Sequence, residues 1–129
     1  MSFVKKRSNT SNITRYYNIE PVFSSLSAIE WISSIRNIHG LQVEYIQYGD
    51  LMNRSDEGSN NVQLDAQVTI EIMKQELKTK DVDIIALNGT FIGKPLVIGV
   101  DLRSSLVYLI VRKRRPADVE LIEKVLKLV

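Results

Sequence analysis

Three apolar segments follow one another near the carboxyl end of the chain, with only short links between them. They are Val82 to Leu87, Leu96 to Leu102 and Leu106 to Arg112. Asn88-Gly89 is predicted as a turn after the first segment, and Ser104-Ser105 as the tight connection between the last two. Because strands joined by short links pair antiparallel, these segments predict a three-stranded antiparallel meander.

Two amphipathic helices and a further strand are predicted around this meander. Between Pro21 and Gly40, apolar residues recur at spacings of three and four, which is typical of a helix with one buried face. Leu41 to Tyr48 then alternates between apolar and polar residues, which predicts a strand with Leu41 and Tyr45 on the same face. Pro116 suits the first turn of a final helix.

The segment from Val62 to Lys80 fits two templates. Apolar residues alternate strictly with polar ones as far as Ile72, which is typical of a strand. On a helical wheel the same residues fall on two opposite faces, and the strong helix formers from Met73 onward favour a helix. We therefore expect a helix over Val62 to Lys80, with a strand over Val62 to Ile72 as the alternative.

A helix with two apolar faces would leave one of them uncovered. The uncovered stripe is predicted to be Leu64, Val68 and Ile72. A second copy of the same helix would cover it most simply, because two-fold dimers are the commonest oligomers. The sequence therefore predicts a homodimer. The polar residues expected to flank the stripe and orient the partner are Glu71, Gln75 and Lys78.

Length and composition are those of one globular unit. The chain has 129 residues, 44% of them apolar and 25% charged, which is ordinary for a single domain. Residues 1–20, rich in Ser, Asn and Thr, are expected to form a basic tail, and residues 21–129 the domain. No apolar run approaches the roughly 20 residues that span a bilayer, and residues 1–20 lack a secretory signal. A cytoplasmic protein without a membrane span is therefore expected.

The residues available for chemistry are few. The sequence contains no cysteine and one histidine, His39. Thiol nucleophiles, disulfides, thiolate metal sites and histidine-pair metal sites are thereby excluded. No Ser-His-Asp arrangement or Gly-rich phosphate loop can be recognised in the remainder. We expect a non-enzymatic protein with no cofactor, metal ligand or catalytic residue.

One pair of acidic residues supports a less favoured alternative. Asp83 and Asp101 lie at the ends of predicted strands, Arg103 follows two positions after Asp101, and Glu71 lies upstream. The pattern resembles metal-dependent nucleases, in which two acidic residues hold a divalent cation and a lysine assists. Arginine stands in place of that lysine. A Mg²⁺-dependent nuclease is therefore the third hypothesis.

A compact basic run follows the last predicted strand. It consists of Arg112, Lys113, Arg114 and Arg115. Such a run can contact phosphates, alone or with the basic cluster of the tail. Because no aromatic residues interleave with it, the alternative interpretation is a solvated strand end. Association with nucleic acid is the second hypothesis.

The predicted element order resembles that of the roadblock and dynein-light-chain family over Pro21 to Val129. The best local matches are Val43 to Asp50, Val82 to Leu87, Leu96 to Leu102 and Leu106 to Val111. The resemblance implies an α/β (α+β) domain of roadblock/profilin-like class, with a five-stranded antiparallel sheet, the first and last helices on one face and the middle helix on the other. It also implies a homodimeric adaptor that binds a partner protein, such as a small Ras-like GTPase, through the middle helix and the sheet edge.

Overall fold

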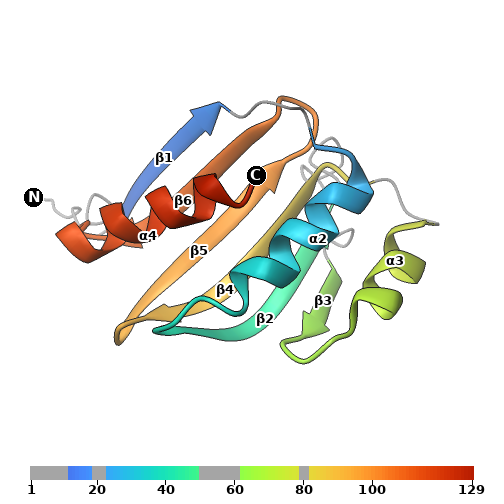
Figure 1. The fold of residues 1–129 in the computed structure, drawn as a ribbon, viewed down its shortest axis with the longest axis horizontal. Helices are drawn as coiled ribbons and strands as arrows, with labels where there is room; N and C mark the ends of the chain where they lie inside the picture. The colour runs from blue at the N-terminus through green and yellow to red at the C-terminus, as the bar shows by residue number, and fades with distance from the viewer. Residues whose placement is uncertain (1–11, 19–22, 50–61, 79–81) are drawn as a thin grey trace, which may run out of the picture.

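One antiparallel sheet of six strands forms the centre of the protein. The computed structural model describes residues 12–18, 23–49, 62–78 and 82–129, and in them the strand order is β1-β6-β5-β4-β2-β3 (Figure 1). The strands are β1 (Asn12–Asn18), β2 (Leu41–Gly49), β3 (Val62–Asp65), β4 (Ile84–Phe91), β5 (Lys94–Asp101) and β6 (Leu106–Arg112). The helices found in the same residues are α2 (Ser25–Ile35), α3 (Ile70–Lys78) and α4 (Pro116–Lys127). An α+β domain with an antiparallel sheet is confirmed, with one strand more than expected.

The three helices pack on the same side of the sheet. In Figure 1, α2 and α4 lie in front of the sheet and α3 lies beside α2, near the β3 edge. Trp31 of α2 donates a hydrogen bond from Nε1 to the carbonyl oxygen of Val125 in α4, at 3.3 Å. Met73 and Leu77 of α3 belong to the same buried cluster as the apolar residues of α2. The expectation that the middle helix covers the opposite face is therefore wrong.

Chain topology explains why the helices share a side. Neighbouring strands are all antiparallel, so β1 runs parallel to β2, and β3 runs parallel to β4. α2 links the first parallel pair and α3 links the second, and such crossovers are almost always right-handed. The connection from β3 to β4 crosses the sheet in the opposite direction to the connection from β1 to β2, and its strands also run in the opposite direction. Because both directions are reversed, two right-handed connections place α2 and α3 on the same face of the sheet.

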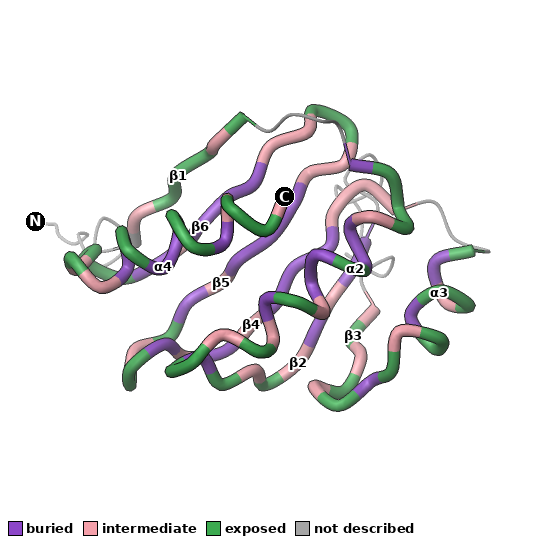
Figure 2. Tube along the Cα trace, in the orientation of Figure 1, coloured by how far each residue is buried: buried purple, intermediate pink, exposed green. Residues whose placement is uncertain are grey.

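The core lies between the sheet and the helices. Figure 2 shows buried positions recurring along the central strands β4, β5 and β6. Leu87 of β4 pairs directly with Ile98 of β5, which pairs with Leu109 of β6. These three residues form one cluster with Ile32 of α2 and Leu121 of α4. These contacts join segments that are far apart in the sequence.

The segment from Val62 contains a strand and a helix in succession. It forms β3 as far as Asp65, turns, and enters α3 at Ile70. The side chain of Asp65 accepts a hydrogen bond from the backbone N–H of Gln67 at 2.8 Å, and the hydroxyl of Thr69 accepts one from the N–H of Ile72 at 3.2 Å. Short polar side chains that bond nearby backbone groups favour turns and helix starts over helix interiors. The predicted helix is therefore wrong before Ile70, where the strand alternative holds for β3.

The first turn of the meander lies later than predicted. Asn88 and Gly89 belong to β4, and the chain reverses at Ile92 and Gly93, which have φ angles of 47° and 81°. Positive φ at two successive residues suits a two-residue hairpin turn. Gly89 is needed for another reason: it lies opposite an irregularity in β2, and a Cβ there would overlap the carbonyl oxygen of Gln42.

That irregularity in β2 is a β-bulge at Glu44. Pairing with β4 skips this residue, since Val43 lies opposite Gly89 and Tyr45 opposite Asn88. An extra residue reverses the alternation of faces beyond it. Tyr45 therefore points away from the helices, and the prediction that it shares the face of Leu41 is wrong.

Part of the predicted tail belongs to the sheet. Residues 12–18 form β1, which pairs with β6 over its whole length. Its partly buried side chains Ile13 and Tyr17 pack against the core from the same face of the strand. The prediction of a tail over residues 1–20 is therefore wrong for this strand, and residues 1–11 lie outside the described part of the chain.

Candidate interaction surfaces

The predicted dimerisation stripe is not one surface. Leu64 lies on β3 and packs partly buried against the core, whereas Val68 lies in the turn after β3 and is only 9% exposed. Ile72 lies on α3 and is 48% exposed. Because the chain changes from strand to helix between them, the three side chains have no common helix face. The physical basis for dimerisation through this helix is therefore absent.

The polar residues predicted beside that stripe do lie together. Glu71 and Gln75 are exposed on the outer side of α3, and Lys78 is exposed beside them, at a groove between α3 and α2. Glu76 instead turns inward, where its Oε1 accepts a hydrogen bond from the Tyr48 hydroxyl at 2.7 Å. Burial, and then the hydrogen bond and charge of Glu76, raise the pKa of Tyr48 to about 12. This contact attaches α3 to the sheet and leaves its outer side free for a partner.

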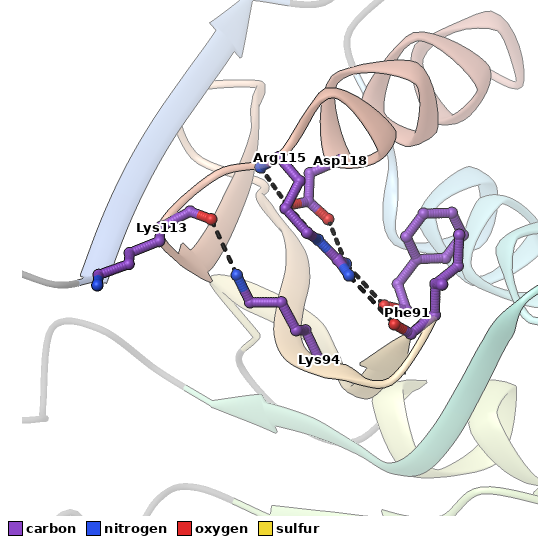
Figure 3. A network of polar contacts seen from close by, with 6 residues as sticks. Phe91, Lys94, Lys113, Arg115 and Asp118 are labelled. Atoms are coloured by element: carbon purple, nitrogen blue, oxygen red, sulfur yellow. Dashed lines mark hydrogen bonds and ion pairs between the residues drawn. The ribbon is translucent and has the colours of Figure 1, made fainter.

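The basic run divides between two roles. Arg112, Lys113 and Arg114 are exposed, whereas Arg115 is the N-cap residue of α4. Figure 3 shows the Arg115 guanidinium between Asp118 and the β4–β5 turn. Its Nη2 donates to the Phe91 carbonyl oxygen at 2.7 Å and to Asp118 Oδ1 at 2.9 Å. Arg115 is therefore occupied within the fold, and phosphate contact by the three exposed residues stays a prediction.

Asp118 completes the same network from within α4. Its side chain is 1% exposed, and its Oδ2 also accepts the backbone N–H of Arg115 at 2.8 Å. Burial by itself would raise the pKa of this carboxyl. The hydrogen bonds and charge of Arg115 lower the pKa by more than burial raises it, so the pKa lies below its ordinary value. The same pairing raises the pKa of Arg115. The pair is a structural clamp between α4 and the β4–β5 turn.

The two aspartates of the nuclease hypothesis lie on neighbouring strand ends. Asp83 Oδ2 lies 3.8 Å from Arg103 Nη1, and its carbonyl oxygen accepts the Leu102 N–H at 2.7 Å. Asp101 Oδ1 accepts the backbone N–H groups of Arg103 and Ser104, at 3.0 and 3.4 Å. These interactions organise the β5–β6 turn. Among the described residues, no three acidic or histidine side chains group closely enough to hold a metal ion.

The side of the sheet opposite the helices, called the open face below, has an apolar centre. The side chains that form it are Ile84, Ala86, Val97, Tyr108 and Ile110. They alternate along β4, β5 and β6 with residues of the core, so they point away from the helices. Figure 1 shows the helices of the described residues on the other side of the sheet. Ala86 and Tyr108 are nevertheless only 1% and 8% exposed, so Ile84, Val97 and Ile110, which are half-buried, supply the accessible apolar surface of this face.

Two tyrosines extend the open face towards the β1 edge. The rings of Tyr16 and Tyr108 have centroids 5.9 Å apart, and Tyr16 is 61% exposed. Tyr108 lies over Gly99, where a Cβ would overlap its ring. Burial, followed by the proximity of Tyr16 and Asp101, raises the pKa of Tyr108 to about 12. An aromatic ring thus fills the space that glycine leaves at the middle of the face.

A depression of about 280 Å³ lies on the open face. Its lining includes the apolar or aromatic side chains of Tyr45, Val97 and Ile110, and also the charged residues Glu44 from β2 and Arg112 from β6. The bulge places Glu44 and Tyr45 at this depression, because it reverses the faces of β2. One acidic and one basic residue therefore lie beside apolar residues in the same depression.

Sequence reasoning missed the open face although one signal could have found it. β5 contains Leu96, Val97, Ile98, Gly99 and Val100 in succession, with no polar alternation. Unbroken apolar runs are typical of strands that are covered on both faces. The helices cover only one face here. The second apolar face therefore remains without a covering helix among the described residues.

Comparisons of the chain with known proteins do not identify a family. No protein-family model matches it, and no curated protein or solved structure does either. The resemblance to the roadblock family therefore remains a prediction. None of the helices in the described residues is long and apolar enough to cross a membrane.

Proposed function

We propose that the chain is a non-enzymatic protein-binding module that forms a two-fold homodimer through its open face. The observation that supports this proposal best is the half-buried apolar surface of Ile84, Val97 and Ile110, which lies around the buried Ala86 and Tyr108 on the side without helices. Burying such a surface against another apolar surface is the main driving force of protein association. A second copy supplies a matching surface without any further component.

The size of the sheet is compatible with a stable dimer. Six strands spaced about 4.8 Å apart, with about seven residues rising about 3.3 Å each, give a face of roughly 500 Å² per copy. Two such faces bury about 1,000 Å² in total, which is the lower limit for a specific interface. The proposed dimer is therefore one of moderate affinity, in which a few contacts decide the outcome.

Charge on the open face favours one arrangement of the two copies. A two-fold axis parallel to the strands and between β4 and β5 places β6 of each copy opposite β2 of the other. Arg112 then faces Glu44 of the second copy, and the same pair forms twice. Near-parallel strands are also the preferred alignment when two sheets pack face to face. The face is thus complementary to itself in charge and in apolar content.

A charge exchange tests this arrangement. We expect the intact chain to have twice its 14.7 kDa mass in light scattering at tens of micromolar. Arg112→Glu or Glu44→Arg alone should place like charges opposite each other, and each should give a monomer. The double variant restores the opposite charges and should restore the dimer.

Two further variants complete the experiment. Val97→Lys, at the apolar centre, should give a folded monomer by circular dichroism and mass, whereas Glu123→Arg on the exposed side of α4 should stay dimeric. A monomeric intact chain would contradict the proposal. Dimers of the two single charge variants would contradict the arrangement.

A small Ras-like GTPase as the additional partner is a proposal that rests only on the family resemblance.

A further inference from the structure

A groove runs between α2 and α3 on the side of the molecule opposite the open face. It has a volume of about 510 Å³, and its lining consists of the apolar residues Leu26, Ile29 and Leu77 together with Ser25, Lys74 and Lys78. Ile29 of α2 and Leu77 of α3 form part of the core at its base, and Leu26, in the first turn of α2, lies at the groove with 57% of its surface exposed. An exposed leucine above an apolar base forms an apolar patch that a partner's side chain can cover.

Two lysines give this groove a charge. Lys74 and Lys78 lie one turn apart on α3, and both line the groove. Within the described residues, no carboxylate forms an ion pair with either of them. Like charges four residues apart on a helix repel each other. A partner that brings negative charge to this wall removes that repulsion.

We infer that this groove binds an amphipathic helix with acidic residues from a partner protein. Apolar side chains of such a helix, spaced three and four residues apart, fit between two helices, which is a common mode of peptide recognition. Carboxylates four residues apart on the flank of the bound helix match the spacing of Lys74 and Lys78. Phosphate alone would leave Leu26 uncovered, so the apolar lining favours a peptide.

This inference does not depend on the proposed dimer. The groove is formed by α2 and α3, whereas the proposed dimer uses the opposite side of the sheet. Each subunit of a dimer therefore presents one groove to solvent. A partner with two acidic helices could then bind both grooves, which raises its overall affinity.

The probe for this site is a fluorescein-labelled synthetic peptide with leucines at i, i+3, i+4 and i+7 and glutamates on the adjoining flank. Its matched control carries lysines in place of the glutamates. With the full chain in an anisotropy titration, we expect the acidic peptide to bind at least tenfold more tightly than the basic one. Added salt should weaken the binding of the acidic peptide.

Variants of the chain assign the binding to the groove. Lys74→Glu combined with Lys78→Glu should lower the affinity for the acidic peptide at least tenfold and raise that for the basic peptide. Leu26→Ser should weaken both peptides, and Lys124→Glu, an exposed change on α4, should weaken neither by more than twofold. None of these variants should change the mass of the assembly in light scattering, that is, whether the protein is a monomer or a dimer. This readout separates the peptide test from the test of the dimer.

Two results would overturn the inference. One is an equal affinity for the acidic and basic peptides, or no binding of either at 100-fold excess of protein over the label. The other is binding to vesicles of phosphatidylserine that the double lysine variant abolishes while the peptide does not bind. That second result would assign the groove to an anionic membrane surface.

Discussion

Asp118 shows how one buried charge is accommodated in this fold. The carboxylate is removed from water but accepts hydrogen bonds from the Arg115 guanidinium and backbone. The guanidinium also reaches the carbonyl oxygens of Phe91 and Ile92, at 2.7 and 3.1 Å. Since a buried charge is tolerated only when it is paired and hydrogen-bonded, this cluster depends on both residues. The arginine that resembles part of a phosphate site thus stabilises a helix start.

Replacing Asp118 should reveal the strength of this clamp. Asp118→Asn keeps the shape but removes the charge, and we expect the free energy of unfolding at pH 7 to fall by about 2 kcal/mol, the range for hydrogen bonds to charged groups. Urea unfolding followed by circular dichroism measures this. Glu120→Gln, an exposed change on the same helix, should alter stability by less than about 0.5 kcal/mol.

The difference between the parent and Asp118→Asn should depend on pH. The pKa of Asp118 is lowered in the folded state, so its stabilising contribution is complete above the unfolded value of about 3.9 and is lost as the pH falls through the folded pKa. The two proteins should therefore converge in acid. A difference that grows as the pH falls would contradict this account of the clamp.

At the scale of elements, β1 is attached to the sheet by fewer side chains than the central strands. Ile13 and Tyr17 are only partly buried, Thr14 and Arg15 are exposed, and no other strand of the described residues lies outside β1. β5 instead lies between β4 and β6 and is buried at half of its positions. Local opening requires less free energy where few apolar contacts are lost.

Hydrogen exchange should therefore separate these two strands. We expect the β1 amides that bond to β6 to exchange at least tenfold faster than the β5 amides, measured by NMR at neutral pH. Ile13→Ala should accelerate exchange in β1 and leave β5 unchanged. Equal protection of the two strands would show that β1 opens only with the whole domain.

At the scale of the whole molecule, the proposed dimer makes stability depend on concentration. If the folded subunits associate through the open face, mass action stabilises the folded state as the protein concentration rises. We expect the unfolding temperature of the intact chain to increase by several degrees over a hundredfold range of concentration in differential scanning fluorimetry. Arg112→Glu should abolish this dependence, and an unchanged midpoint for the intact chain would count against the dimer.

Local chemistry determined much of the fold. The periodic apolar residues before Ile35 and the proline at position 116 specify α2 and α4, and alternation specifies most of β2. Apolar runs with short links specify the β5–β6 part of the meander. These features depend on residues a few positions apart, so they can be read from the chain itself. The absence of cysteine likewise excluded thiol chemistry from the sequence alone.

Only the tertiary structure decided which surfaces remain uncovered. The sequence of Val62 to Lys80 fits both a strand and a helix, and pairing of β3 with β2 together with packing of Met73 and Leu77 divides it between them. The sequence shows that Val97 and Ile110 are apolar, but it does not show whether a helix covers the face of the sheet on which they lie. Crossover handedness and the bulge at Glu44 determine the uncovered side, because both depend on contacts between strands that are distant along the chain.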